Sequence, residues 1–182
     1  MRLDQFDSSA FDRGRPRLVE ALWLLVQALF VSSWIPGSAH RVALLRLFGA
    51  RIGKGVMVKP GARIKFPWRL EVGDFSWIGE DAWIDNLATV TIGRNCCISQ
   101  GAYLCTGSHD WSRTTFDLVL KPITIEDEAW IAAAGVVGPG VIVGRRAVLT
   151  LGSVAVSALR AGWIHSGHPA QAVRQRNGPA DA

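Results

Sequence analysis

The stretch IGRNCCISQGAYLCTGSH, residues 92–109, holds the pattern that decides the fold, because an aliphatic residue returns at every sixth position. Ile92, Ile98 and Leu104 open three consecutive six-residue units, and the fifth residue of each unit is small. A short fixed period is the sequence signature of a solenoid, in which each repeat buries its apolar side chains against its neighbours. The two-residue alternation of an ordinary strand would not restrict the fifth position in this way.

The six-residue unit, or hexad, recurs over most of the chain. Hexads open at positions 52, 72, 78, 92, 98, 104, 125, 131, 137, 143 and 149. We expect the aliphatic first residue to face inward together with a small fifth residue, which is Ser76, Ala82, Cys96, Ala102, Ser108, Ala129 or Ala147. Three hexads close a triangular coil, so the sequence predicts a mainly β fold, a single-stranded left-handed parallel β-helix. The handedness follows from identifying the hexad, since most crossovers between parallel strands are right-handed.

The interruptions of the period carry information as well. Hexads at 52, 72 and 92 start twenty residues apart, so each coil there has two extra residues at a corner. The next hexad in this series starts at position 125. The residues in excess of one coil fall directly after His109. We therefore expect residues 110–122 to leave the prism as a loop, and long excursions from a rigid scaffold usually carry function.

The chain before the first hexad has helical patterns over residues 17–35 and 39–48. We expect these helices to cover the first coil, whose apolar end would otherwise face water. Arg41 and Arg46 are then left for solvent or phosphate.

Three segments follow from this division. They are an N-terminal helical cap over 1–50, a β-helix over 51–158, and a C-terminal extension over 159–182 whose tail we expect to be frayed.

Composition restricts the class of protein. The 182 residues are 49% hydrophobic and 19% charged, which suits one folded domain with extra apolar surface for a subunit contact or a membrane. A net charge of +5 makes an anionic partner plausible, but the basic residues are too scattered to indicate nucleic acid. Three cysteines without paired spacing indicate neither a disulfide framework nor a zinc site, and with no visible secretory signal they favour the cytoplasm.

Residues 18–35 raise the question of a membrane. As a helix they would reach about 27 Å, short of a hydrocarbon core of about 30 Å, and polar residues interrupt them. We expect packing against the protein itself, a partner subunit or the inner face of a membrane rather than a span.

His109 follows the inward positions Leu104 and Ser108 as the sixth residue of its hexad. Its side chain should face outward at a corner, beside the excursion. An imidazole in that place could serve as a general base, or it could be an ordinary polar residue at a loop entrance, and spacing alone does not decide.

The sequence resembles a known family. GAYLCTGSHD, PITIEDEAWIAAAGVVGPGVIVGRRAV and SVAVSALRAGWIHSGHPAQAVRQR resemble the hexapeptide-repeat O-acetyltransferases, which include galactoside, maltose and nodulation-factor acetyltransferases. LLRLFGARIGKGV and PWRLEVGDFSWIGEDAWIDNLATVTIG place the resemblance nearest the branch of colanic acid biosynthesis acetyltransferases. It covers residues 40–176.

The resemblance implies an O-acyltransferase that moves an acetyl group from acetyl-CoA directly to a hydroxyl of a sugar or exopolysaccharide precursor. His109 matches the general base, with no acyl-enzyme and no metal. Cys96 and Cys97 then need no nucleophilic role and are interpreted as packing residues. The family also implies a homotrimer in which adjacent subunits share the sites.

The residues expected to bind acetyl-CoA follow from the same match. Trp130 would flank the pantetheine arm, Leu151 is a further residue expected to bind acetyl-CoA, and the Ala133 N–H would stabilise the oxyanion. Ala132 replaces the family's usual glycine, which narrows the groove. Arg160, Arg174 and Arg176 lie where relatives meet the phosphates, although each could equally be a solvated charge.

Four residues are candidates for the acceptor sugar. Asp85 and Asn86 precede His109 by one coil and could bind hydroxyl groups, although both types also favour turns. Trp83 and Trp111 offer flat faces for sugar rings.

Two alternatives were weighed. The zinc-dependent γ-type carbonic anhydrases share this fold but need three histidines from adjacent coils, and only His109 of the four histidines lies within the coils. A non-catalytic hexapeptide-repeat scaffold remains the rival, and it predicts no acetyl transfer.

Overall fold

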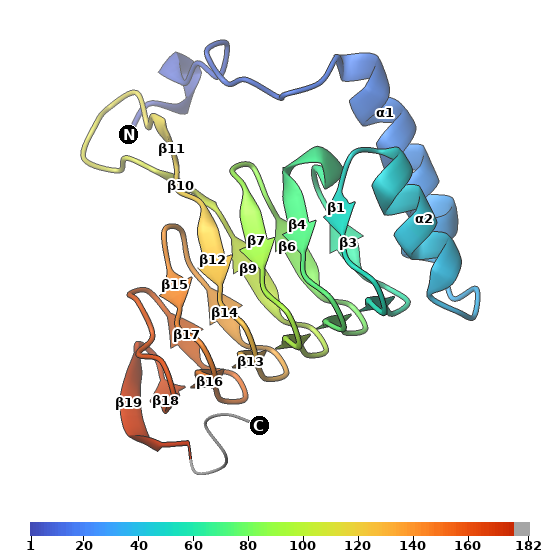
Figure 1. Ribbon diagram of the computed structural model, residues 1–182. Helices are drawn as coiled ribbons and strands as arrows, with labels where there is room; N and C mark the ends of the chain where they lie inside the picture. Colours follow the sequence, from blue (N-terminus) through green and yellow to red (C-terminus); the bar gives the residue numbers. More distant parts are fainter. Residues whose placement is uncertain (177–182) are drawn as a thin grey trace.

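The computed structural model describes residues 1–176, and in it short strands wind into stacked triangular coils (Figure 1). Three parallel sheets form the sides of a prism, here called sides A, B and C. Side A contains β1 (Arg51–Ile52), β4 (Leu70–Val72), β7 (Val90–Ile92), β12 (Ile123–Ile125) and β15 (Ile142–Val143). Side B contains β2 (Met57–Val58), β5 (Trp77–Ile78), β8 (Cys97–Ile98), β13 (Trp130–Ile131), β16 (Val148–Leu149), β18 (Trp163–Gly167) and β19 (Ala170–Gln175). Side C contains β3 (Arg63–Ile64), β6 (Trp83–Asp85), β9 (Tyr103–Cys105), β14 (Val136–Val137) and β17 (Val154–Ala155).

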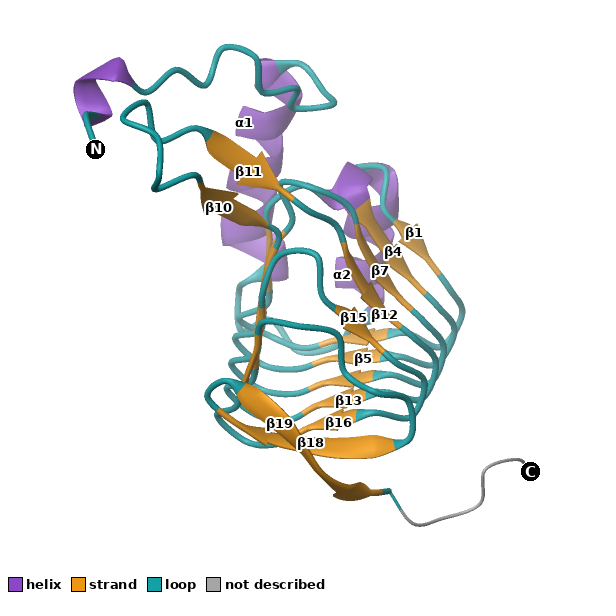
Figure 2. Ribbon diagram, turned by 90° about the vertical axis from the view of Figure 1, so that its left-hand side faces the viewer, coloured by secondary structure: helices purple, strands orange, loops and turns teal. Residues whose placement is uncertain are grey.

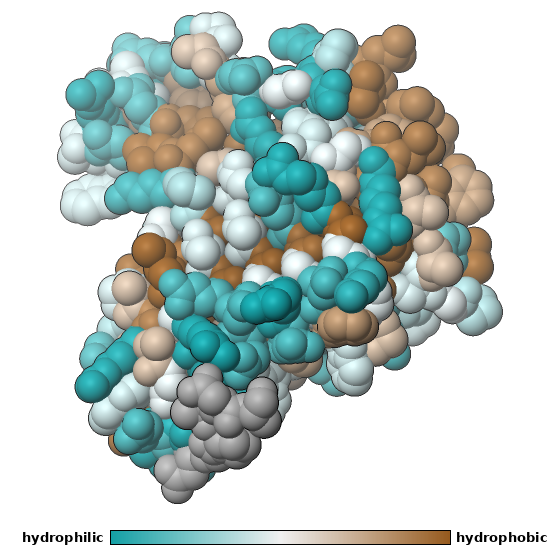
Figure 3. All heavy atoms as spheres, viewed as in Figure 1, coloured by the Kyte–Doolittle hydropathy of each residue, from teal (hydrophilic) through white to brown (hydrophobic). Residues whose placement is uncertain are grey.

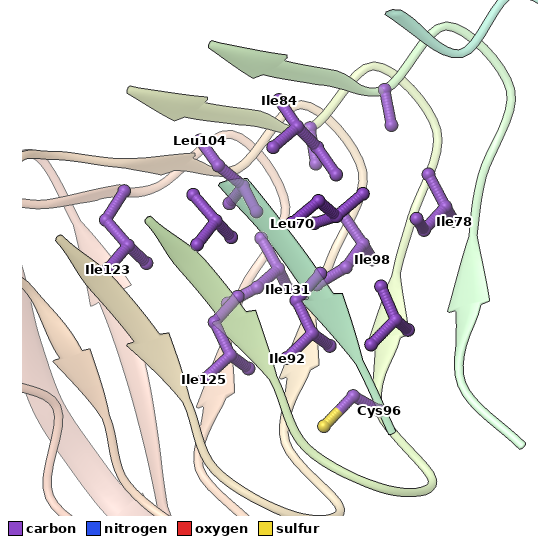
Figure 4. Packing of buried hydrophobic residues seen from close by; sticks show 14 of the residues in the cluster. Leu70, Ile78, Ile84, Ile92, Cys96, Ile98, Leu104, Ile123, Ile125 and Ile131 are labelled. Carbon is purple, nitrogen blue, oxygen red and sulfur yellow. The ribbon is translucent and has the colours of Figure 1, made fainter. Parts of the chain in front are cut away.

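The core of the prism confirms the hexad prediction. Every first hexad residue from Ile52 to Leu149 is buried, and so are the small fifth residues apart from Ser108. Figure 4 shows Ile78, Ile98 and Ile131 stacked in one row inside the coils. The small fifth side chains leave room at the corners for these larger ones, which explains why that position is restricted.

Ser108 is the exception, because its side chain is exposed. It belongs to β10 (Gly107–His109), which pairs antiparallel with β11 (Leu118–Leu120) instead of continuing the coil. The excursion therefore begins at residue 107 as a hairpin, three residues earlier than expected. Buried Thr106 anchors its base: its hydroxyl donates to Asp85 O over 3.0 Å and accepts from Ala88 N over 2.9 Å.

The helical segments α1 (Arg17–Val26), η2 (Gln27–Val31) and α2 (Ala39–Leu47) cover the first coil as expected. Each edge strand of that coil forms a hydrogen bond with at least one side chain of these segments. The Gln27 amide oxygen accepts from Ile64 N over 2.6 Å on β3, and the Ser38 hydroxyl accepts from Val58 N over 2.7 Å on β2. The Arg46 guanidinium donates to Ile52 O over 2.8 Å on β1. These contacts satisfy backbone groups that an open edge would leave unpaired.

The expectation that Arg41 faces solvent or phosphate is wrong, whereas Arg46 is exposed and its guanidinium also donates to Ile52 O. Arg41 is fully buried, and its guanidinium donates to the carbonyl oxygens of Val31, Ser33, Ile35 and Gly37. Burial without a carboxylate partner lowers the pKa of Arg41. These four hydrogen bonds hold the turn between η2 and α2, which is a structural task.

The C-terminal part continues the prism beyond residue 158. β18 pairs in parallel with β16, and β19 folds back antiparallel on β18. His165 is therefore a buried inward residue of the last coil, although the sequence placed it outside the coils. The tail expected to be frayed beyond residue 176 lies outside the described residues. Over residues 1–176, no helix is both long and apolar enough to cross a bilayer.

Candidate active site

The excursion hairpin holds His109 in a defined orientation. The imidazole Nδ1 lies 2.8 Å from the carbonyl oxygen of Phe116, and the two rings stack with centroids 4.2 Å apart at 1°. A carbonyl oxygen can only accept, so Nδ1 carries the proton and Nε2 presents a lone pair. The side chain is outward as expected, but it stands on the hairpin rather than at a corner of the coil.

The N-terminal segment crosses the hairpin (Figure 1). Arg2 N donates to Thr114 O over 2.8 Å, and η1 (Leu3–Gln5) follows. The Phe6 ring then meets the His109 ring edge-on, with centroids 5.3 Å apart at 65°. The imidazole is thus enclosed by one aromatic ring from the hairpin and one from the N-terminus.

A cavity of about 420 Å³ lies between this segment and the hairpin. Its lining residues are Asp7, Ser8, Ala10, Phe11, Asp117, Leu118 and Leu120. His109 is paired with Leu118, and Gly107 is paired with Leu120. Since alternate residues of a strand share one face, Leu118 and Leu120 lie on the same face of the hairpin as His109. No pattern in the sequence predicted this cavity, because the first twelve residues show no periodicity.

Asn86 and Asp85 do not form the expected pair of sugar ligands. Asn86 is fully buried, and its amide accepts from Phe66 N and donates to Phe66 O over 2.9 and 2.7 Å. It therefore joins two coils, and the expected sugar contact is wrong. Asp85 is largely covered and lies 3.4 Å from Lys65 Nζ, while Tyr103 Oη donates to it over 3.2 Å. Burial first, and the neighbouring Cys105 and Asp85, raise the pKa of Tyr103.

The two candidate tryptophans differ. Trp83 has its ring stacked on Tyr103 at 4.6 Å, with the Arg63 guanidinium 4.6 Å from its centroid. Arg63 and Tyr103 come from strands on opposite sides of β6, so both ring faces are covered and the expected sugar stacking is not available. Trp111 lies in the hairpin turn with 83% of its surface exposed.

A second hollow lies at the corner between sides B and C. It measures about 280 Å³, and Trp130, Ala133 and Leu151 line it together with Ser99, Gln100, Ala132, Val148 and Thr150. Trp130 Nε1 donates to Ser99 Oγ over 2.9 Å, which fixes the indole as one wall. Among the described residues the Ala133 N–H has no acceptor, and Glu80 N and Gln100 N at equivalent corners are likewise unbonded. The structure thus brings together three of the residues expected to bind acetyl-CoA.

The histidine and this hollow occupy different corners of the prism. The hairpin leaves between β9 on side C and β12 on side A, whereas Ala133 follows β13 at the corner between sides B and C. Figure 2 shows the hairpin standing away from the strands of side B. Within one chain the two groups therefore face different directions.

The three arginines are not gathered at the hollow. Arg174 lies opposite Ile164, in the same outward row of side B as Trp130 and Val148. The Arg160 guanidinium lies 4.5 Å from the Trp163 ring centroid. Arg176 donates to Glu128 O and Arg146 O over 3.0 and 3.3 Å, so its guanidinium partly serves to hold the C-terminal strand.

The cysteines show different exposure. Cys96 is buried inside the coil, where burial raises the pKa of its thiol to about 11, and it donates to Glu126 O over 3.1 Å. Cys97 lies half-buried on side B in the row of Trp77 and Trp130. A buried neutral thiol is a poor nucleophile, as the packing interpretation requires. No group of three or more metal-binding side chains occurs within residues 1–176.

Comparison with known proteins identifies the family. No family model matches the sequence. The chain is 40% identical over 166 residues to the Escherichia coli K12 protein assigned as colanic acid biosynthesis acetyltransferase WcaF, covering 90% of this chain and 91% of that protein. The chain belongs to the hexapeptide-repeat acetyltransferases.

Solved structures of this family agree with the fold. The hexapeptide-repeat acetyltransferase VCA0836 from Vibrio cholerae O1 biovar eltor, complexed with acetyl coenzyme A, has a TM-score of 0.83 at 25% identity and covers 95% of this chain and 93% of that chain. A galactoside acetyltransferase in complex with coenzyme A also has a TM-score of 0.83, at 22% identity, covering 93% and 86%. The chain is therefore a member of an enzyme family with the predicted architecture.

Proposed function

We propose that this acetyltransferase moves an acetyl group from acetyl-CoA to a hydroxyl of a sugar or exopolysaccharide precursor in the cytoplasm, with His109 as general base. The observation that carries the proposal is the hydrogen bond from His109 Nδ1 to Phe116 O. In the neutral imidazole this bond places the proton on Nδ1 and leaves an oriented lone pair on Nε2, which is the atom that a general base needs. The bound acetyl-CoA of the Vibrio cholerae relative supports the choice of donor.

In the proposed reaction the acceptor hydroxyl gives its proton to Nε2 while its oxygen attacks the thioester carbonyl. A backbone N–H, which we assign to Ala133, stabilises the resulting oxyanion. The intermediate collapses to the ester and the thiolate of CoA, and the imidazolium returns its proton to that sulfur. This direct transfer forms no acyl-enzyme and needs no cysteine nucleophile. The Cys96 thiol, which burial holds neutral, agrees with that mechanism.

The cavity beside His109 is the proposed acceptor site. It combines the Asp7 and Asp117 carboxylates and the Ser8 hydroxyl with apolar Phe11, Leu118 and Leu120, a mixture suited to a sugar's hydroxyls and ring faces. The exposed indole of Trp111 adds a surface for stacking at the hairpin turn. Asp85 is assigned to supporting the coil below, since Lys65 and Tyr103 already contact it.

The proposed acetyl-CoA site is the hollow at Trp130, Ala133 and Leu151, with Arg174, Arg160 and Arg176 along the last coil for the phosphates. Because the hollow and His109 face different directions in one chain, a complete site needs the hollow of a second chain beside the histidine. We therefore propose a homotrimer with three shared sites.

A thiol-release assay tests the proposal. Acetyl-CoA is offered with a panel of nucleotide-linked and lipid-linked sugars, and wild type is compared with His109→Ala and with the exposed-turn control His168→Ala. We expect His109→Ala to lower kcat by about 10²–10⁴-fold, with the KM for acetyl-CoA and the thermal midpoint unchanged. The control should retain wild-type kcat. Equal rates for His109→Ala and wild type would exclude this base, and no thiol release with any acceptor would favour the scaffold alternative.

A further inference from the structure

Apart from Arg17 at its start, the helix formed by α1 and η2 and the adjoining Ser32 direct their polar side chains toward their own protein. Gln27 binds the edge strand β3, and the Ser32 hydroxyl donates to Ala62 O over 2.9 Å. Glu20 accepts two hydrogen bonds from the Arg13 guanidinium, at 2.9 and 2.8 Å. The fully buried Trp23 also faces inward, where its Nε1 donates to Ile64 O. Apart from that of Arg17, the polar side chains of this helix thus bond to the protein on its inner side.

The outer side of the same helix is apolar. Leu18, Leu22, Leu25 and Leu29, here called the outer leucine stripe, recur at helical spacing and are 80%, 51%, 58% and 54% exposed. Further exposed apolar residues flank the stripe, namely Leu24, Phe30, Trp34 and Ile35. Figure 3 shows hydrophobic atoms gathered along the edge of the molecule where α1 and α2 lie in Figure 1. A contiguous patch of this kind is uncommon on a freely solvated surface.

Basic side chains stand at the start of this surface. Arg15 and Arg17 are exposed and form no ion pair within the described residues. At the other end, Trp34 is 74% exposed, and an indole suits a boundary between apolar and polar surroundings. Leucines, a tryptophan and flanking arginines together match an anionic lipid surface in both polarity and charge.

We propose that the outer leucine stripe docks the protein on an anionic phospholipid bilayer, with the helix lying in the plane of the interface. The fifteen residues of α1 and η2 reach about 22 Å, which is too short to span a bilayer. The stripe inserts among the acyl chains, and Arg15 and Arg17 meet the headgroups. This docking is independent of the acetyl transfer proposed above.

Flotation of the full chain with vesicles tests the docking. Phosphatidylcholine vesicles with and without phosphatidylglycerol are compared, using wild type and the double variant Leu22→Glu with Leu25→Glu. The matched control is Val156→Glu with Val173→Glu, which changes two exposed apolar side chains elsewhere by the same charge. We expect wild type and control to float with anionic vesicles, and the leucine variant to lose at least about tenfold in bound fraction.

Variants of Arg15 and Arg17 provide a second test of the docking. Arg15→Gln with Arg17→Gln should lower binding to anionic vesicles toward the level seen with neutral ones, and added salt should do the same to wild type. His109→Ala should float like wild type, so a failure of the proposed chemistry leaves this test intact.

Three results would overturn the docking. One is wild type remaining in the lipid-free fraction, and another is equal loss in the leucine variant and its control. The third is a lower oligomer mass for the leucine variant in size-exclusion chromatography with light scattering, because the stripe would then be a contact between copies.

Discussion

The corner of the prism between sides B and C differs from the corner between sides C and A in the regularity of its turns. At the first corner every coil makes the same tight turn, and the unbonded N–H groups of Glu80, Gln100 and Ala133 follow one another down the prism. At the second corner the chain leaves the prism as a hairpin carrying His109. Repetition thus provides a corner with regular N–H donors, and an interruption of the repeat provides His109, the proposed base.

This difference also explains why the hairpin depends on contacts outside the repeat. Phe116 O orients the imidazole, Phe6 covers it, and Thr106 fixes the base of the hairpin. The corner between sides B and C needs only the stacking of equivalent residues in successive coils. The hairpin at the corner between sides C and A also needs contacts from the N-terminal segment and from its own turn.

Mixing two inactive variants would give the largest effect. His109→Ala removes the proposed base, and Ala133→Trp fills the hollow at the other corner, so the proposed homotrimer of either variant alone should be inactive. In randomly mixed trimers about one site in four combines an intact histidine with an intact hollow, if the two come from different chains. We expect about a quarter of wild-type thiol release in co-expressed oligomers. No recovery would mean that one chain supplies both corners.

Ile98→Ala tests whether stability resides in the regular coil. Its side chain is fully buried between Ile78 and Ile131. We expect a loss of about 2–5 kcal/mol in the free energy of unfolding, measured by chemical denaturation, from lost burial and the cavity left behind. The control Ser108→Ala, on the exposed face of the hairpin, should change it by less than about 0.5 kcal/mol. Comparable losses would contradict the distinction between coil and hairpin.

Phe116→Leu separates the orienting carbonyl from the stacked ring. The carbonyl remains, while the ring contact with His109 is lost. Aromatic contacts contribute about 0.5–1.5 kcal/mol, so kcat should fall by roughly 2- to 12-fold with an unchanged KM for acetyl-CoA. Phe75→Leu, an exposed aromatic at a corner of sides A and B, is the control and should have no effect. A loss as large as that of His109→Ala would show that the ring, rather than the carbonyl, holds the base.

His165→Gln tests the last coil and should have the smallest effect. Burial lowers the pKa of His165, whose Nε2 accepts from Arg160 N over 3.1 Å. Below about pH 6.5 His165 therefore binds a proton more readily in the unfolded chain than in the folded chain. The free energy of unfolding consequently falls as pH falls. The thermal midpoint of wild type should drop more between pH 7.5 and 5.5 than that of the variant. Parallel pH curves would mean that His165 accepts its proton in the folded state.

Much of the fold was predictable because the hexad is local and repeated. The register steps of twenty, thirty-three and eighteen residues on side A, from Ile52 through Val72, Ile92 and Ile125 to Val143, follow directly from the spacing of hexads. The capping role of the helices was also predictable, since an apolar coil end must be covered. The error at Ser108 arose because a small residue in the fifth position fits both a coil and an exposed hairpin strand.

The site was predictable only where it lies on the repeat. Trp130, Ala133 and Leu151 come together because hexads stack in register. Asn86 and Trp83 lie on the repeat too, but their neighbours Phe66, Arg63 and Tyr103 occupy the groups that a sugar would need. Which of these groups are occupied depends on side-chain orientation, and the spacing of hexads does not specify that orientation.

The amino-acid sequence by itself determined the triangular coil and the place of its interruption, because like residues stack when they recur at a fixed short period, and its motifs carried the resemblance to the family. Only the tertiary structure decided that Phe116 and Phe6 enclose the imidazole, that Arg41 is buried on four carbonyl groups and that the outer leucine stripe faces outward. These features join segments far apart in the chain or depend on which face of a helix packs, and no short-range pattern records such contacts.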